Sequence, residues 1–190
     1  MNQFAFQDEI PSNYCWGCGR TNSHGLQMKS RWSGDKAVCT WHPKEYHVGP
    51  KHFLNGGIIA TIIDCHCIWT ATAGAYRAEG RKMYSHPSIW YVTASMTVSY
   101  LHPTPVNRPV VLHAQIQEMN PKKTILTCSL FSEEEECARG EVVAVRVPPE
   151  WPEEHGLLMQ VQNLNGSRKA STGAAEAEEG KRRASDHQGS

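Results

Sequence analysis

The sequence predicts an α+β fold in which a curved antiparallel sheet wraps around one long central helix. The first indication is a single apolar segment of helical length, residues 56–80, which begins with two glycines. The second is the arrangement of strand-like segments, two before this helix and four after it, separated by turn sequences. Strands grouped in this way, without regular alternation with helices, are typical of α+β domains.

The segment before the helix is expected to form a β-hairpin. Residues 25–32 (GLQMKSRW) and 37–43 (AVCTWHP) have strand character. The sequence between them, SGDK, is a turn sequence suited to a hairpin. We therefore expect two short antiparallel strands ahead of the helix.

The helix itself is expected to be enclosed by the rest of the domain. It opens with glycines and ends near Gly80, and its apolar residues surround almost the whole circumference. A helix of this kind must be covered by other elements, because no face of it is suited to water. A strongly curved sheet would cover it, and the exposed edges of such a sheet are usually managed by pairing with a second copy.

Four strand-like segments follow the helix and are expected to form successive hairpins. They are rich in β-branched residues and cover residues 90–101, 109–119, 123–132 and 141–147. The turn sequences HPTPVNRP, NPKK and EEEECARG separate them. The last of these, residues 133–140, is interpreted as a loop.

Size and charge indicate one globular domain that does not bind nucleic acid. The chain has 190 residues, 39% of them hydrophobic, and a formal net charge of zero. No basic block interrupts its body, whereas phosphate binding requires a local excess of Lys and Arg. We divide the chain into a Cys- and Gly-rich segment (1–24), the main domain (25–150), a C-terminal extension (151–164) and a disordered tail (165–190).

The cysteines and the N-terminal sequence favour a cytoplasmic location. Seven cysteines is an odd number, and the first residues lack the basic and apolar regions of a signal peptide. We therefore expect reduced thiols. The apolar window 58–78 is long enough to suggest a membrane span, but Asp64, His66 and Arg77 within it argue against one. The tail has no aromatic residue and no Ile, Leu or Val, so it is expected to be disordered.

Three short sequences resemble the hotdog-fold thioesterases of the PaaI-like group. They are NGGIIATIID at the helix start, TASMTVSYLHPTP in the next strand and CWGCGRTNSHGLQMK upstream. These proteins commonly carry His-Gly-Gly before the central helix and an Asp or Glu partway along it. The similarity covers about residues 13–147 and implies hydrolysis of acyl-CoA or a carrier-protein thioester, without a cofactor, by a dimer or a dimer of dimers. The chain departs from the group at Asn55, where histidine is usual.

The proposed chemistry needs a group that polarises the thioester carbonyl and a group that activates water. Backbone N–H groups at a helix start lack intrahelical acceptors, so the Gly57 N–H is the candidate donor to the carbonyl oxygen, with Gly56 beside it. Asp64 is the candidate base, because burial raises the pKa of a carboxyl towards neutrality. Direct attack of its carboxylate on the carbonyl, which gives an anhydride, is an equally valid alternative. About 10 Å of helix separates Gly57 from Asp64, which favours a site completed across a dimer.

Each of these residues also has a structural interpretation, and the sequence leaves the alternatives open. The glycines could serve only the entry into the helix. Asp64 could bind a structural donor or lie on an exposed strip of the helix. Asn55 could donate a hydrogen bond to the substrate or cap the helix, since Asn is among the preferred N-cap residues. A non-hydrolytic acyl-CoA-binding or thioester-processing protein of the same fold is the alternative to a hydrolase.

Further residues are candidates for contacts with the substrate. Thr93 and Ser95 share one face of their predicted strand, and the resemblance implies that this strand runs beside the helix. Ile58 follows the two glycines, and His66 could tune Asp64 across the interface. Polar residues on the wet face of a sheet explain Thr93 and Ser95 equally well.

A zinc site is the competing interpretation of the cysteines. Cys15, Cys18, Cys39 and His42 follow the spacing C-x2-C-x20-C-x2-H, close to that of zinc ribbons. Against it, residues three apart on a strand face opposite sides, so His42 would point away from Cys39. A tight Gly-rich turn explains residues 15–19 without metal. We therefore expect no metal site.

Overall fold

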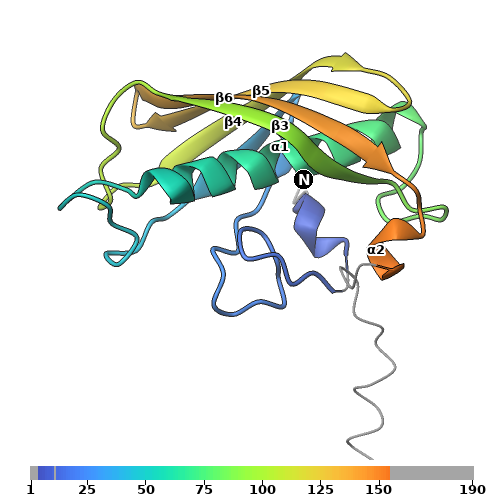
Figure 1. Ribbon diagram of the computed structural model, residues 1–190, viewed down its shortest axis with the longest axis horizontal. Coiled ribbons are helices and arrows are strands. Elements are labelled where there is room, and N and C mark those ends of the chain that lie inside the picture. Colours follow the sequence, from blue (N-terminus) through green and yellow to red (C-terminus); the bar gives the residue numbers. More distant parts are fainter. Residues whose placement is uncertain (1–3, 11, 155–190) are drawn as a thin grey trace, which may run out of the picture. The chain divides into compact units, whose positions relative to one another are not determined.

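A six-stranded antiparallel sheet packs against helix α1 (Gly56–Ala78), which lies along one face of the sheet (Figure 1). The structure is a computed structural model and describes residues 4–10 and 12–154. The order of strands across the sheet is β1-β2-β4-β5-β6-β3. The strands are β1 (Arg31–Ser33), β2 (Lys36–Trp41), β3 (Trp90–Tyr100), β4 (Val110–Met119), β5 (Lys123–Ser132) and β6 (Glu135–Val147). Two short helices, η1 (Phe6–Asp8) and α2 (Trp151–Glu154), complete the described elements. The predicted α+β fold is confirmed.

The predicted N-terminal hairpin is present but shorter than expected. β1 pairs with β2 from Arg31↔Val38 to Ser33↔Lys36, and Gly34 turns the chain with a φ of +66°. A positive φ suits glycine because it lacks a Cβ. Residues 25–30 carry no strand, so only the end of the first predicted segment joins the sheet.

The prediction for the last strand was wrong at its start. β6 begins at Glu135 and not at residue 141, so the turn between β5 and β6 narrows to Glu133 and Glu134. Glu133 has a φ of +58° at this turn. The glutamates suggested a solvated loop, yet Cys137 and Ala138 just after them are buried and Ala138 pairs with Leu130 of β5. Burial of these two residues and pairing with β5 extend the strand despite the charged sequence.

The expectation of successive hairpins was wrong between β3 and β4. β3 pairs with β6, from Trp90↔Val147 to Tyr100↔Ala138, and therefore lies at the edge of the sheet. A register shift between Thr93 and Ser95 interrupts this ladder. β3 also contacts α1, so this edge strand and the helix together border the candidate site.

The core lies between α1 and the inner face of the sheet. Ile62 and Ile63 of α1 are completely buried, as is Leu126 of β5. Gly140 of β6 allows this close approach, since a Cβ there would lie 2.5 Å from Ile63 Cγ2. α1 has the length and composition of a membrane span, but 78% of its apolar window is buried inside the structure. Packing against the sheet thus explains its hydropathy.

The Cys- and Gly-rich segment covers part of α1 that the sheet leaves free. Cys18 and Leu26 are buried in the same core as the helix. The backbone folds back on itself here, with Gly19 N donating to Cys15 O at 2.8 Å and Leu26 N donating to Trp16 O at 2.8 Å. The predicted tail 165–190 and most of the extension 151–164 lie outside the described residues.

Candidate active site

Asp64 lies near the middle of α1 with its carboxyl group only partly buried. Its Oδ1 accepts a short hydrogen bond from Thr93 Oγ1 on the edge strand β3. Burial raises the pKa of Asp64 above its ordinary value, and the smaller effect of the Thr93 hydroxyl opposes this shift. An oriented carboxyl of this kind is suited to accepting a proton.

A pocket of about 210 Å³ opens beside this carboxyl. Ile68 and Trp69 of α1 and Trp90 and Val92 of β3 supply its apolar wall. The two indole rings meet edge to face, with centroids 6.0 Å apart. The remaining lining residues are Asn13, Cys15, Cys18, Asp64, Cys65, Thr72 and Thr93. The pocket is thus a mostly apolar cavity with a carboxyl group at one side, an arrangement common in small-molecule sites.

At the start of α1, Asn55 caps the helix. Its Oδ1 accepts a hydrogen bond from the Gly57 N–H at 2.8 Å, and its backbone oxygen accepts from Ile58 and Ile59. The prediction that Asn55 caps the helix is therefore confirmed. The same bond occupies the Gly57 N–H, which the sequence had suggested as the donor to a carbonyl oxygen.

Gly56 is the residue at the helix start whose N–H remains free. No residue within 4–10 and 12–154 accepts a hydrogen bond from this group. The backbone oxygen of Gly56 accepts a hydrogen bond from the hydroxyl of Tyr100 on β3 at 2.8 Å. A Cβ on Gly56 would lie 3.4 Å from the Tyr100 ring, an ordinary contact distance. The Gly57 N–H is thus bonded to Asn55, whereas the Gly56 N–H is available to a substrate.

The other predicted contact residues fall in different places. Thr93 joins Asp64 at the pocket, whereas Ser95 does not line it. The prediction that these two residues share one face of the strand was wrong, because the register shift between them breaks the alternation. Ile58 is half-buried in the first turn of α1, near Gly56 and away from the pocket. His66 is completely buried, with Nδ1 2.8 Å from Ser30 Oγ and Nε2 3.2 Å from Ala37 O. Burial lowers the pKa of His66 to about 4, so it is a neutral core residue.

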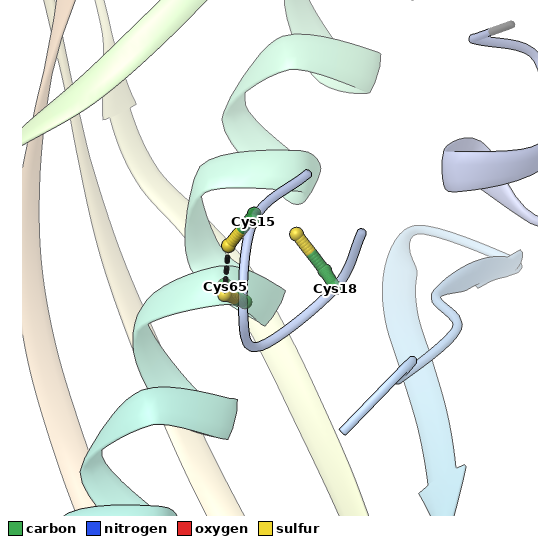
Figure 2. Close-up of side chains that lie close together, drawn as sticks. All are labelled: Cys15, Cys18 and Cys65. Carbon is green, nitrogen blue, oxygen red and sulfur yellow. Dashed lines mark hydrogen bonds between the residues drawn. The ribbon is translucent and has the colours of Figure 1, made fainter. Parts of the chain in front are cut away.

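The structure brings together a cysteine group that the sequence did not predict. Cys15 and Cys18 of the N-terminal segment meet Cys65 of α1, and the three sulfur atoms lie within 4.8 Å of one another (Figure 2). Cys39, the third cysteine of the zinc-ribbon spacing, is buried on β2, and His42 is exposed. That ligand set is not assembled. Spacing could identify the first pair, but the partner on α1 requires the tertiary structure.

A larger hollow of about 650 Å³ lies on the opposite face of the sheet. It is lined by side chains such as Val111 and His113 of β4, which alternate with the buried Leu112 and Ala114. Neither Asp64 nor the helix start contributes to it. The smaller pocket beside Asp64 is therefore the better candidate for a reactive site.

Gly17 allows the N-terminal segment to pack directly against α1. A Cβ at this position would lie 2.5 Å from Cys65 Sγ and 2.8 Å from Thr61 Cγ2. We expect Gly17→Ala to lower the free energy of unfolding by about 1–3 kcal/mol, because the segment must move away from the helix. Urea denaturation measures this change. Gly34→Asn, in an open turn with a φ that Asn tolerates, is the control. Equal stability of Gly17→Ala and the wild type would contradict this packing.

Curated proteins similar to the chain are named as acyl-CoA thioesterases. Acyl-coenzyme A thioesterase THEM4 from Xenopus laevis is 30% identical over 110 residues, which is 58% of this chain and 44% of that protein. THEM4 from Mus musculus is 31% identical over 106 residues, covering 55% and 40% respectively. The chain thus spans less than half the length of these relatives. No protein-family model matches the chain.

Solved structures show the same fold. A thioesterase superfamily protein from Shewanella loihica is 35% identical, with a TM-score of 0.53, and the match covers 67% of this chain and 96% of that one. The PaaI protein from the phenylacetic acid degradation operon of E. coli has a TM-score of 0.53 at 12% identity, over 64% and 80% of the two chains, and supports the fold alone. The identity to the Shewanella protein over nearly its whole length shows that the chain belongs to the thioesterase superfamily.

Proposed function

We propose that the chain hydrolyses an acyl thioester, with acyl-CoA as the substrate class. The observation that carries this proposal is the Asp64 carboxyl, oriented by Thr93 at the side of a mostly apolar pocket. The names of the curated relatives support the substrate class. In this arrangement the pocket holds the acyl group and Asp64 stands next to the scissile carbonyl.

The second element of the site is the free N–H of Gly56. A preorganised donor aimed at the developing oxyanion typically lowers a barrier by about 2.7–4 kcal/mol. The Gly57 N–H is already bonded to Asn55, so we assign this role to Gly56. Asn55 then acts as a positioning residue, because its cap fixes the first turn of α1.

Gly56 and Asp64 of one chain are too far apart to act on the same carbonyl. Eight residues of helix separate them, which corresponds to about 12 Å along the axis. We therefore infer that each site combines Gly56 of one subunit with Asp64 of the partner subunit. The surface near the helix start supports such pairing, since Tyr100 and Leu101 at the end of the edge strand β3 are 54% and 45% exposed. Apolar groups on a free strand edge are suited to pairing with a second copy.

The proposed reaction proceeds by attack of water on the thioester carbonyl. Asp64 takes a proton from the water as the new C–O bond forms, and the Gly56 N–H of the other subunit binds the oxyanion. Collapse of the tetrahedral intermediate breaks the C–S bond, and the Asp64 carboxyl returns its proton to the leaving sulfur. The products are a carboxylic acid and free CoA.

Hydrolysis of a panel of acyl-CoAs tests this function. The panel contains short, medium and long straight-chain acyl groups and an aromatic one, and the released CoA is separated and quantified. We expect turnover of at least one member by the wild type. Binding of acyl-CoA without any release of CoA would contradict the proposal and identify a binding protein of the same fold.

Thr93 is expected to support catalysis through Asp64. Thr93→Val removes the hydroxyl that donates to Asp64 Oδ1 but keeps the branched shape. A hydrogen bond to a charged group contributes about 1.5–3 kcal/mol, so we expect kcat to fall by roughly tenfold or more. Thr93→Ser, which retains the hydroxyl, should restore most of the rate. Steady-state kinetics of the two variants measure this difference, and equal rates for both would contradict a role for the hydroxyl.

A further inference from the structure

Three cysteines from two separate parts of the chain converge at the wall of the Asp64 pocket. Cys15 and Cys18 lie on the loop that crosses α1, and Cys65 projects from the helix towards them (Figure 2). The sulfur atoms of Cys15 and Cys65 are 3.7 Å apart, and all three sulfurs lie within 4.8 Å of one another. The proposed hydrolysis uses none of these thiols.

The spacing of the sulfurs fits a thiolate-bound zinc ion. Zn–S bonds are about 2.3 Å long, so two sulfurs at the tetrahedral angle lie about 3.8 Å apart. The Cys15–Cys65 distance already has this value within 0.1 Å or so, and Cys18 needs to move by no more than about 1 Å. A disulfide bond would instead require a sulfur separation of about 2.05 Å.

The surroundings of the sulfurs favour negative charge. Trp69 Nε1 donates to Cys18 Sγ at 3.0 Å, and Asn13 Nδ2 lies 3.7 Å from the same sulfur. Hydrogen bonds from Cys18 and Cys65 lower the pKa of Cys15, whereas the thiol of Cys15 raises the pKa values of its two partners. N–H donors to a ligand sulfur are also a usual outer shell of metal sites.

The four other cysteines do not form a comparable group. Cys39, Cys67, Cys128 and Cys137 are all buried, and in the described part of the chain no third metal-binding side chain gathers with any pair of them. Burial raises the pKa of Cys39 to about 12. These residues are small core side chains, and they supply matched controls for the group at the pocket.

We propose that Cys15, Cys18 and Cys65 bind one zinc ion, with the fourth coordination position open towards the Asp64 pocket. Each thiol that enters the site as a neutral group releases its proton to solvent when the Zn–S bond forms. The ion would join the N-terminal loop to α1 one residue from Asp64. A site with three protein ligands and an open position differs from a closed structural zinc site, which uses four.

The test uses the full chain, reduced and stripped of metal by a chelator, to which Zn²⁺ alone is added. Competition with a coloured chelator measures stoichiometry and affinity, and Co²⁺ in place of Zn²⁺ reports thiolate ligation through its charge-transfer absorption. We expect about one ion per chain and a higher Tm with zinc. Cys15→Ser and Cys18→Ser should each weaken binding by at least about tenfold, since loss of outer-shell partners alone typically costs 10–100-fold.

Two further variants are controls that should bind zinc as the wild type does. Cys39→Ala removes a buried cysteine outside the group and should retain full stoichiometry. Asp64→Asn should also bind zinc normally, so that loss of hydrolysis and loss of metal are distinguished. Cys15 is only half-buried, whereas Cys18 is buried, so Cys15→Ser is expected to disturb folding less than Cys18→Ser. Circular dichroism checks that both variants fold. Absence of binding by the reduced wild type, or binding that survives both serine variants, would overturn the proposal.

Discussion

Asp64→Asn is expected to lower kcat for acyl-CoA hydrolysis by about 10²–10⁴-fold, the usual contribution of a positioned general base. Asparagine has nearly the same shape, and its side-chain oxygen can still accept the hydrogen bond from Thr93. It cannot take a proton from water. The apolar pocket that binds the acyl group is unchanged, so KM should change little.

Steady-state kinetics on the best substrate of the panel, with Tm as a check on folding, measure this effect. Asp35→Asn is the matched control, because Asp35 is exposed in the turn between β1 and β2, outside the pocket. It should retain the wild-type kcat. A folded Asp64→Asn variant with undiminished kcat would exclude Asp64 as the base and would leave the pocket without an assigned catalytic group.

Gly56→Pro is expected to lower kcat by about 10²–10³-fold, because it removes the backbone donor proposed to bind the oxyanion. Proline is tolerated at the first position of a helix, where the N–H has no intrahelical acceptor. The preceding residue, Asn55, already has the extended conformation that proline requires, with φ of −63° and ψ of 131°. The substitution therefore removes the donor with little change in the helix.

Gly56→Ala is the matched control for the proline variant. It keeps the N–H and adds only a Cβ, which would lie 3.4 Å from the Tyr100 ring. We expect a kcat within a few-fold of wild type. Kinetics of both variants, with far-UV circular dichroism for helix content, distinguish loss of the donor from a change in shape. Similar rates for the two variants would contradict the role assigned to Gly56.

The long helix and most of the strands could be predicted because their signals are local. Glycines and apolar residues define α1, and β-branched segments define β3, β4 and β5 almost to the residue. The start of β6 was missed because its glutamates favour solvent, whereas burial of Cys137 and Ala138 decides the outcome. The pairing of β3 with β6 could not be derived from local sequence, since it depends on how the sheet closes over the helix.

The candidate site was predictable in its chemistry but only partly in its geometry. A carboxyl group within an apolar helix led us to propose Asp64. Thr93 was proposed with Ser95 from their alternation along the strand, but a register shift between these two residues breaks that alternation. The choice between Gly56 and Gly57 depends on one hydrogen bond, which the Gly57 N–H donates to Asn55 Oδ1 and which sequence spacing does not determine. His66 was proposed as a residue that could tune Asp64, but it does not line the pocket. Asp64, two residues earlier, faces the pocket, but a helix turns by about 100° per residue, so His66 points to nearly the opposite side and lies in the core.

Mixed oligomers of the two inactive variants test the shared site most directly. Gly56→Pro and Asp64→Asn chains, co-expressed in equal amounts with different affinity tags, form dimers of which about half contain one chain of each kind. If each site takes Gly56 from one subunit and Asp64 from the other, every mixed dimer regains one intact site. The unfractionated mixture should then show about one quarter of the wild-type activity. If both residues act within one chain, no intact site can form, and activity of the mixture no higher than that of the separate variants would contradict the shared site.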